Sequence, residues 1–170
     1  MGRYRRAVLL RCTARLLKLL GDRAGPLAET PPGMDDWYAN VLVIERRKCL
    51  LLVHADTLFA VFDPDVRVAQ FDDLGLYVAT LVVDALTWEG LPGSALGSTD
   101  PAGVRAAKTA SRSMLGHLNQ MALEIEHAVA SAGGLERIDV AAVNQRLRRG
   151  LRGRDGRYVV PIELAAARSA

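Results

Sequence analysis

The strongest constraint on the fold is a pair of aliphatic runs that lie close together in the chain. Residues 41–44 and 50–53 are β-branched and aliphatic, and only the polar segment 45–48 separates them. Continuous apolar runs of this length are typical of buried strands, and a short polar connection favours an antiparallel hairpin. The sequence therefore predicts a hairpin with a basic tip near the centre of the fold.

Three later segments carry the marks of helices. Residues 73–88 and 111–131 have apolar side chains every three or four positions, which is typical of helices that pack one face on a sheet. Asp72 is a suitable N-cap for the first of these helices, and Gly133 can end the second. Asp139 is expected to cap a third helix that continues to about residue 149.

Shorter strands are expected around these helices. An apolar run near the N-terminus is followed by a helix for which Thr13 is the expected N-cap. The last expected strand contains Pro161, which cannot donate to a central ladder and so favours an edge position. The expected strands cover residues 7–11, 57–62, 104–108 and 158–162.

The order of these elements predicts an α+β fold, with a small, mostly antiparallel sheet covered by two or three helices. Strands and helices do not alternate regularly, which argues against a doubly wound nucleotide-binding fold. A length of 170 residues suits one domain. We therefore expect a single α+β domain over residues 1–170, with a Gly- and Pro-rich loop at 21–36 that is either ordered or flexible and a basic segment at 146–157.

Several classes of protein are excluded by what the sequence lacks. Cys12 and Cys49 are too few for a disulfide-rich secreted domain, so we expect two reduced thiols, with one disulfide between them as the alternative. No apolar stretch is long enough for a signal peptide or a bilayer span, so we expect a soluble, cytoplasmic protein without a membrane partner. Glycine-rich phosphate loops and nucleophile elbows are absent, and we expect no cofactor.

Metal binding is not expected either. His117, Glu124 and His127 lie on adjacent parts of one predicted helix, and Glu124 with His127 makes half of a carboxylate-bridged site. Such sites need a second copy of the pair from another helix, and the sequence has none. We therefore assign these three side chains to a solvated surface.

Residues 108–113 lie where a short strand should lead into the second long helix. They combine cations with hydroxyl groups: Lys108, Thr109, Ser111, Arg112 and Ser113. The first turn of a helix presents unpaired N–H groups and a partial positive charge, so a bound anion would offset the repulsion between these cations. The segment predicts binding of a phosphate or a nucleic-acid backbone. An ordinary hydroxyl cap beside two solvated cations is the alternative.

Two other basic groups are candidates for the same kind of contact. Arg47 and Lys48 at the hairpin tip would extend the anion site if the tip lies beside residues 108–113, and otherwise are solvated. The densest charge lies at 146–157, with six arginines and one acid. Short basic runs neutralise phosphates, but arginines at a helix C-terminus also complement its dipole. The predicted nucleic-acid backbone contacts are Arg146, Arg148, Arg149, Arg152 and Arg154.

Several motifs together resemble a family of small uncharacterised prokaryotic proteins, a domain of unknown function. They are Arg11-Cys12-Thr13, Trp37-Tyr38-Ala39-Asn40, Arg46-Arg47-Lys48-Cys49, Thr57-Leu58-Phe59 and Lys108-Thr109-x-x-Arg112-Ser113-x-Leu115-Gly116. The resemblance spans about residues 8–163. Proteins similar in the last motif are encoded on plasmids and beside insertion-sequence transposases, so the resemblance implies a link to mobile elements. The chain departs from the family pattern near residues 150–157.

We therefore expect an accessory protein of a mobile-element or genome-conflict system that binds nucleic acid or a phosphorylated ligand through the basic helix N-terminus. A small enzyme that acts on a phosphorylated or nucleic-acid substrate is one alternative. A protein-interaction module, such as an antitoxin-like partner or a homo-oligomer, is the other. The sequence leaves open whether the protein catalyses a reaction.

Overall fold

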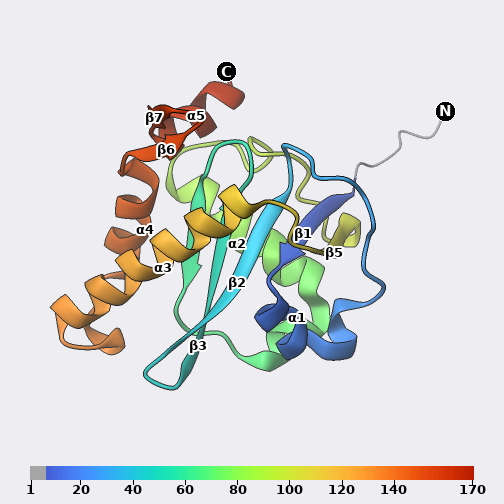
Figure 1. Cartoon of the computed structure of the whole chain (residues 1–170), viewed down its shortest axis with the longest axis horizontal. Coiled ribbons are helices and arrows are strands. Elements are labelled where there is room, and N and C mark those ends of the chain that lie inside the picture. The colour runs from blue at the N-terminus through green and yellow to red at the C-terminus, as the bar shows by residue number, and fades with distance from the viewer. Residues whose placement is uncertain (1–6) are drawn as a thin grey trace.

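The fold is a five-stranded sheet with helices packed on both faces (Figure 1). In the computed structural model, which describes residues 7–170, the strand order is β4-β3-β2-β1-β5. The predicted α+β class is confirmed. The strands are β1 (Val8–Cys12), β2 (Trp37–Ile44), β3 (Arg47–His54), β4 (Ala60–Asp63) and β5 (Val104–Lys108).

The sheet joins an antiparallel meander to a parallel part. The predicted hairpin is present as β2 and β3, and β4 continues it in antiparallel fashion. β1 then lies between β2 and β5 and is parallel to both. All five residues of β1 are buried, as expected for a parallel strand with neighbours on both sides. A separate two-stranded antiparallel ribbon consists of β6 (Arg152–Arg154) and β7 (Arg157–Val159).

Two helices cover each face of the sheet, where the sequence predicted two or three in all. α1 (Ala14–Leu20) and α2 (Leu74–Trp88) pack on one face, and α3 (Arg112–Ala132) and α4 (Val140–Arg149) on the other. The fifth helix, α5 (Pro161–Arg168), follows the ribbon. No helix within residues 7–170 is long and apolar enough to cross a bilayer.

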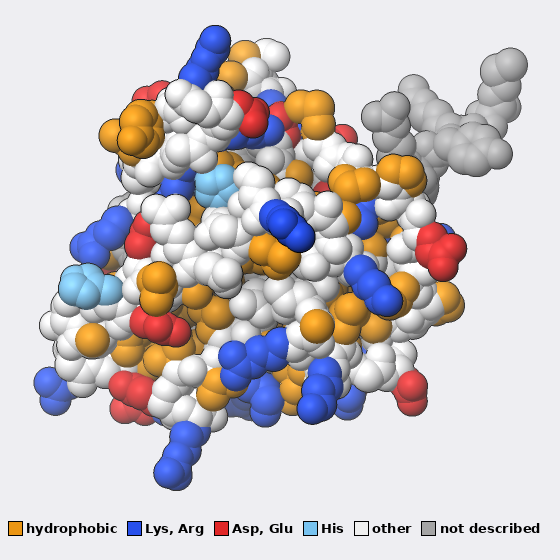
Figure 2. Space-filling view, viewed as in Figure 1, with side chains coloured by type: hydrophobic (Ala, Val, Ile, Leu, Met, Phe, Trp, Pro, Cys, Tyr) orange, Lys and Arg blue, Asp and Glu red, His pale blue; other side chains and the backbone are white. Residues whose placement is uncertain are grey.

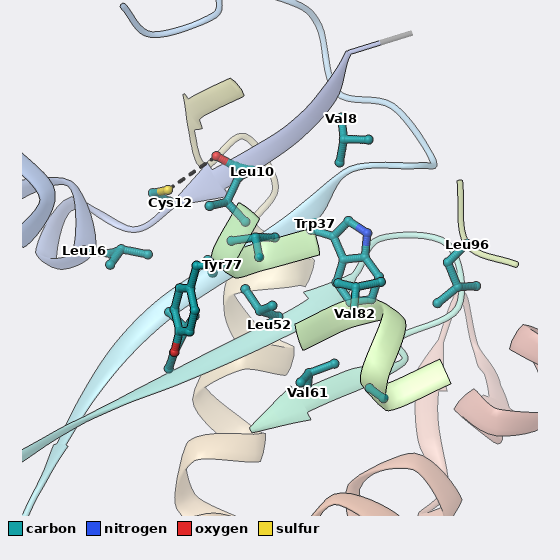
Figure 3. Packing of buried hydrophobic residues seen from close by; sticks show 14 of the residues in the cluster. Val8, Leu10, Cys12, Leu16, Trp37, Leu52, Val61, Tyr77, Val82 and Leu96 are labelled. Atoms are coloured by element: carbon teal, nitrogen blue, oxygen red, sulfur yellow. Dashed lines mark hydrogen bonds between the residues drawn. The ribbon is translucent and has the colours of Figure 1, made fainter. Parts of the chain in front are cut away.

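The two faces of the sheet have separate cores because strand side chains alternate in direction. Trp37 and Leu52 pack under α2 (Figure 3), whereas Leu51 packs under α3. The two cysteines fall in different cores, and both are free thiols. Burial raises the pKa of Cys12 to about 12 and that of Cys49 to about 11, which makes both thiols poor nucleophiles.

Several predicted helix ends are confirmed. Thr13 Oγ1 accepts a hydrogen bond from the N–H of Leu16, and Asp139 caps α4 in the same way. Gly133 ends α3 in the left-handed conformation, with φ of 87°. The cap of α2 is Asp73 and not Asp72.

Two predicted strands differ from the structure. The strand expected at 57–62 begins only at Ala60, because Leu58 turns back with φ of 61° and donates its N–H to the carbonyl of His54. The strand expected at 158–162 ends at Val159. Pro161 instead opens α5, since proline suits the first position of a helix.

The segment at 21–36 makes several fixed contacts with the sheet. Ala28 forms a parallel bridge to Ala107 and donates its N–H to the carbonyl of Ala106. Near its end, Asp36 accepts a 2.6 Å hydrogen bond from buried Arg11. These contacts hold the segment along β5 and β1.

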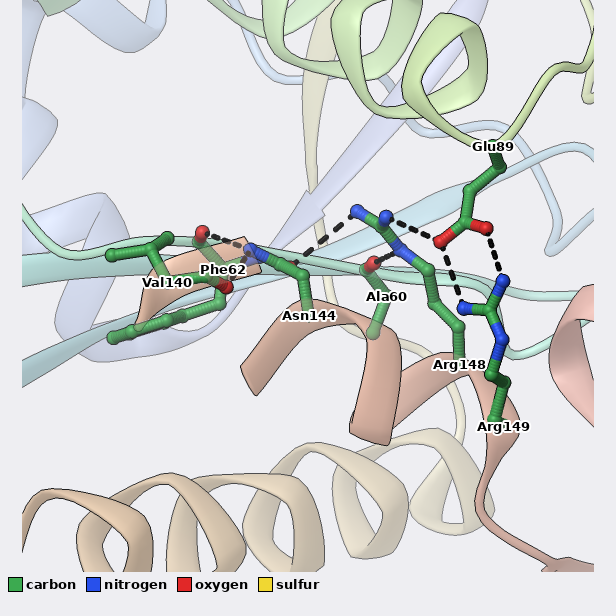
Figure 4. Close-up of polar contacts among 7 residues, drawn as sticks. All are labelled: Ala60, Phe62, Glu89, Val140, Asn144, Arg148 and Arg149. Carbon is green, nitrogen blue, oxygen red and sulfur yellow. Dashed lines mark hydrogen bonds and ion pairs between the residues drawn. The ribbon is translucent and has the colours of Figure 1, made fainter. Parts of the chain in front are cut away.

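The outer edge of β4 is covered by side chains of α4 (Figure 4). The amide of Asn144 accepts from the N–H of Phe62 at 2.8 Å and donates to its carbonyl at 3.0 Å. Arg148 Nε donates to the carbonyl of Ala60 at 2.8 Å. Both backbone groups of Phe62 and the carbonyl of Ala60, which a further strand would use, are thus already bonded.

Candidate functional site

The basic hairpin tip lies at the far end of α3 from residues 108–113. Glu45 accepts a hydrogen bond from the N–H of Leu135, which follows the C-terminus of α3, and Arg47 pairs with Glu136. α3 has 21 residues and is therefore about 30 Å long. The combined anion site considered for the two segments does not form, and exposed Arg47 and Lys48 belong to the other end of the molecule.

Much of the predicted arginine interface is directed into the protein (Figure 4). Arg148 is buried, lies 4.6 Å over the ring of Phe59 and donates to Glu89. Arg149 makes two further hydrogen bonds to Glu89, at 3.1 and 2.6 Å. Burial alone would raise the pKa of Glu89, but the hydrogen bonds from the two arginines outweigh it and hold that pKa below its usual value.

The other arginines of this run have three different environments. Arg152 is buried and forms two hydrogen bonds to Glu124, at 2.5 and 2.9 Å. Arg154 is half-buried, 3.5 Å from Asp56. Arg146 is exposed and makes no ion pair with residues 7–170. Buried Arg148 and Arg152 cannot reach a nucleic-acid backbone in this conformation, because their guanidinium groups are already enclosed and paired with carboxylates.

Residues 108–113 differ from the arginine run in that their polar groups are available. Ser111 caps α3 by accepting from the N–H of Met114 at 3.2 Å. Within the described chain, the N–H groups of Arg112 and Ser113 have no hydrogen-bond partner, and Lys108 and Arg112 are exposed without an ion pair. The five predicted residues lie where β5 leads into α3: Lys108 ends β5, half-buried Thr109 lies in the connection, and Ser111, Arg112 and Ser113 begin α3.

A cavity of about 340 Å³ lies over this end of α3. Its walls come from five places: the start of α3, the loop before β2, β2 itself, the turn between β3 and β4, and the tip of the β6–β7 ribbon. The lining residues are Pro32, Gly33, Met34, Tyr38, Ala55, Leu58, Ser111, Ser113, Met114, His117, Arg154 and Asp155. Two predicted anion contacts, Ser111 and Ser113, therefore share a cavity with one arginine of the other basic segment.

The sequence analysis assigned His117 to a solvated surface, and this assignment is wrong, because His117 lies on the buried face of α3 and lines the cavity. Its side chain is only 8% exposed and has no hydrogen-bond partner among residues 7–170. Burial lowers the pKa of His117, and the nearby charges of Arg152 and Arg154 lower it further, so the imidazole is neutral at neutral pH. The available signal was its spacing, since Met114 and Met121 lie three and four positions away on the buried stripe of α3.

A buried ion pair positions the opposite wall. Arg11 pairs with Asp36 and also donates to the carbonyls of Lys108, at 3.1 Å, and Thr30, at 2.7 Å. The single guanidinium therefore joins β1, the end of β5 and the loop before β2. Tyr38 lies beside this pair, and burial raises its pKa while Arg11 opposes the shift. The hydrogen bonds of Arg11 therefore fix this wall of the cavity in the absence of a ligand.

The basic side chains do not form one continuous surface. Figure 2 shows Lys and Arg in separate groups across the face that carries α3, with uncharged and hydrophobic surface between them. Residues 7–170 also contain no group of three or more His, Cys, Asp or Glu side chains that could hold a metal ion. The cavity at the start of α3 brings together three of the predicted residues, Ser111, Ser113 and Arg154. Lys108, Thr109 and Arg112 lie nearby in the sequence but do not line it.

A family model described as a domain of unknown function (DUF6933) matches residues 9–164. No curated protein sequence matches the chain.

Proposed function

The chain belongs to the DUF6933 family of domains of unknown function, and we propose that it binds a phosphorylated ligand in the cavity at the N-terminus of α3. One observation carries the proposal. His117 is nine-tenths buried and unpartnered within residues 7–170, and it lines the same cavity as the start of α3. The ring nitrogens of His117 are open to the cavity, so a ligand bound there can supply the hydrogen-bond partner that the protein does not.

The groups around His117 suit an anion. Ser113 contributes a hydroxyl and an unpaired N–H, and the N–H of Arg112 is unpaired as well. Both N–H groups lie at the positive end of a 21-residue helix, where phosphates bind most readily. Arg154 faces them across the cavity. The carboxylate of Asp155 also lines the cavity, so the N–H groups, Ser113 and Arg154 must outweigh its repulsion of a phosphate.

The cavity volume favours a small ligand or a chain end over a duplex. About 340 Å³ lies at the lower end of the range for small-molecule sites. Pro32, Met34 and Leu58 add apolar surface for the part of the ligand beyond the phosphate. In the mobile-element setting that the sequence resemblance implies, the ligands to test first are nucleotides and the phosphorylated ends of nucleic acids.

Titration of the purified protein tests this proposal. The ligands are inorganic phosphate, a nucleoside monophosphate, and a short single-stranded DNA with and without a 5′ phosphate, with the ring signals of His117 followed by NMR. We expect the His117 signals to shift with the phosphorylated ligands and the affinity to fall as salt rises.

Matched variants locate the contact. Arg112→Ala should weaken binding, whereas Arg146→Ala removes an equal charge from an exposed site on α4 and should leave it unchanged. Absence of binding by all the phosphorylated ligands at low salt would refute the proposed function. Equal loss in both variants would place the contact elsewhere.

The neutral imidazole also favours a second candidate, a small enzyme with a phosphorylated substrate. Ser113 and His117 are four residues apart on α3 and line the same cavity. A neutral histidine can accept a proton from an attacking hydroxyl or water. Incubation with p-nitrophenyl phosphate tests this candidate: turnover that is lost in His117→Gln while phosphate binding remains would support it, and no turnover by the wild-type chain would argue against it.

A further inference from the structure

The β6–β7 ribbon forms one wall of the cavity and is held very differently at its two ends. At its base, Arg152 is buried and makes two hydrogen bonds to Glu124 and one, at 3.0 Å, to the carbonyl of Leu147. At its tip, Arg154 has a 3.5 Å contact with Asp56 and a 3.9 Å contact with its neighbour Asp155. The base is fixed, and the tip is held loosely.

The contact between Arg154 and Asp56 is too long for a charge-assisted hydrogen bond, which normally measures 2.7–2.9 Å. Asp56 has a closer partner in Arg168, at 2.8 Å, and Arg168 also bonds Asp35 at 2.5 Å. Arg168 is thus the closer partner of Asp56, although it is shared with Asp35, and Arg154 makes the weaker of the two contacts to Asp56. Arg154 is left as a weakly held cation at the mouth of the cavity.

The ribbon itself allows its tip to move. Its turn is formed by Asp155 and Gly156, with φ of 50° and 74°, as in the two-residue turns of tight hairpins. β6 and β7 pair only with each other, and an isolated two-stranded ribbon is marginally stable. Movement of the tip therefore breaks no hydrogen bond of the main sheet.

We propose that the β6–β7 ribbon is a flap operated by the ligand, in which Arg154 leaves Asp56 and binds the phosphate held at the start of α3. This inference rests on the proposed function and adds the way in which the site closes. A phosphate group offers up to two negative charges and three acceptor oxygens, whereas Asp56 offers one charge that Arg168 already shares. Asp56 thus competes with the phosphate for Arg154 and keeps the flap in place when the cavity is empty.

Three variants titrated with inorganic phosphate test the exchange. Asp56→Asn removes the competitor and should raise the affinity about threefold to fivefold, the size expected for losing a partly exposed ion pair. Arg154→Met removes the closing contact and should lower the affinity about tenfold. Asp35→Asn is the matched control, because it removes an equal charge from the other partner of Arg168 and should change the affinity less than twofold.

The outcomes distinguish failure of the proposed flap from failure of the proposed phosphate site. If Asp56→Asn and Asp35→Asn change the affinity equally, the exchange is wrong and the phosphate site stands. If the wild-type chain does not bind phosphate at all, the proposed function fails and the flap fails with it. If Asp56→Asn does not fold, hydrogen exchange at the Gly156 amide of the wild-type chain decides: slower exchange with phosphate supports closure, and unchanged exchange overturns it.

Discussion

Residues 108–113 and 146–157 both concentrate positive charge, and they differ in the carboxylates that lie within reach. Glu89 and Glu124 take up three arginines of the second segment, and Asp56 holds a fourth, Arg154, only weakly at 3.5 Å. Lys108 and Arg112 in the first segment meet no carboxylate of residues 7–170. The denser basic run is therefore chiefly a means of holding α4 and the ribbon to the sheet, and the sparser one keeps its charge available.

This difference shows what a run of arginines does and does not indicate. Charge density along a sequence counts cations but not the distant acids that neutralise them. Glu89 lies about sixty positions from Arg148 and Arg149, at the end of α2 on the other face of the sheet. Cations whose charge remains unmatched are the better candidates for ligand contacts, and in this comparison Lys108 and Arg112 are two of them.

The largest expected effect comes from Arg148. Replacement by alanine removes its bonds to Ala60 and Glu89 and its packing on Phe59, and it leaves Glu89 with Arg149 alone. We expect a loss of about 3 kcal/mol in the free energy of unfolding, measured by urea denaturation. Arg146→Ala on the same helix is the control and should cost less than about 0.5 kcal/mol. Similar small losses in both variants would contradict the structural role of the run.

The dependence of stability on pH is a further test that needs no substitution, and His54 is the residue expected to cause it. This residue is fully buried, and its Nδ1 accepts the N–H of Thr57 at 3.3 Å. Burial and, to a smaller extent, the charge of Arg168 lower the pKa of His54 to about 4, against the opposing charges of Asp35 and Asp56. The unfolded chain therefore binds this proton at higher pH than the folded chain does.

The stability contributed by neutral His54 is full above about pH 6.5 and is lost as pH falls to about 4. The expected loss is about 3 kcal/mol, followed by urea denaturation across this range. His54→Gln should flatten the dependence even if it lowers stability at pH 7. An equally steep dependence in that variant would show that other groups are responsible.

Removing both free cations should affect binding more than stability. The double variant Lys108→Ala with Arg112→Ala is expected to weaken phosphate binding by about tenfold and to reduce its dependence on salt. Arg149→Ala is the control, because it removes a cation that is already paired with Glu89. The Arg149→Ala variant should bind phosphate as tightly as the wild-type chain. If Arg149→Ala weakens binding as much, the distinction between the two segments is wrong.

The smallest expected effect is on the titration of His117. Arg154 lowers the pKa of this imidazole, so Arg154→Met should raise it. Arg146→Met, which removes an exposed charge of α4, should leave it unchanged. NMR titration of the ring signals measures both. An unchanged pKa in Arg154→Met would mean that Arg154 does not face the cavity in solution.

Local features of the fold could be predicted because short segments determine them. The hydroxyl of Thr13, the carboxylate of Asp139 and the conformation of Gly133 act within one turn of their helices. The parallel position of β1 could not be predicted in the same way. β1 pairs with residues about 27 and 96 positions away in the sequence. The local periodicity of a segment does not indicate which distant segments it pairs with.

Only the side of the site that α3 contributes could be predicted from the sequence. Ser111 and Ser113 could be placed at a helix start because a cap has a local pattern. His117 could have been found on the buried stripe of α3, but the cavity that it faces is closed by Tyr38 and Arg154, from strands distant in the sequence. That convergence is a property of the folded chain alone.

The amide of Asn144 has a consequence for how copies of this protein behave at high concentration. It satisfies the N–H and carbonyl of Phe62 in the manner of a peptide group, at the outermost strand of the sheet. Uncovered outer strands are where folded proteins join edge to edge into aggregates. Deamidation of Asn144 would turn its donor into an acceptor and expose that carbonyl, so the resistance of the folded chain to polymerisation would decline as the protein ages.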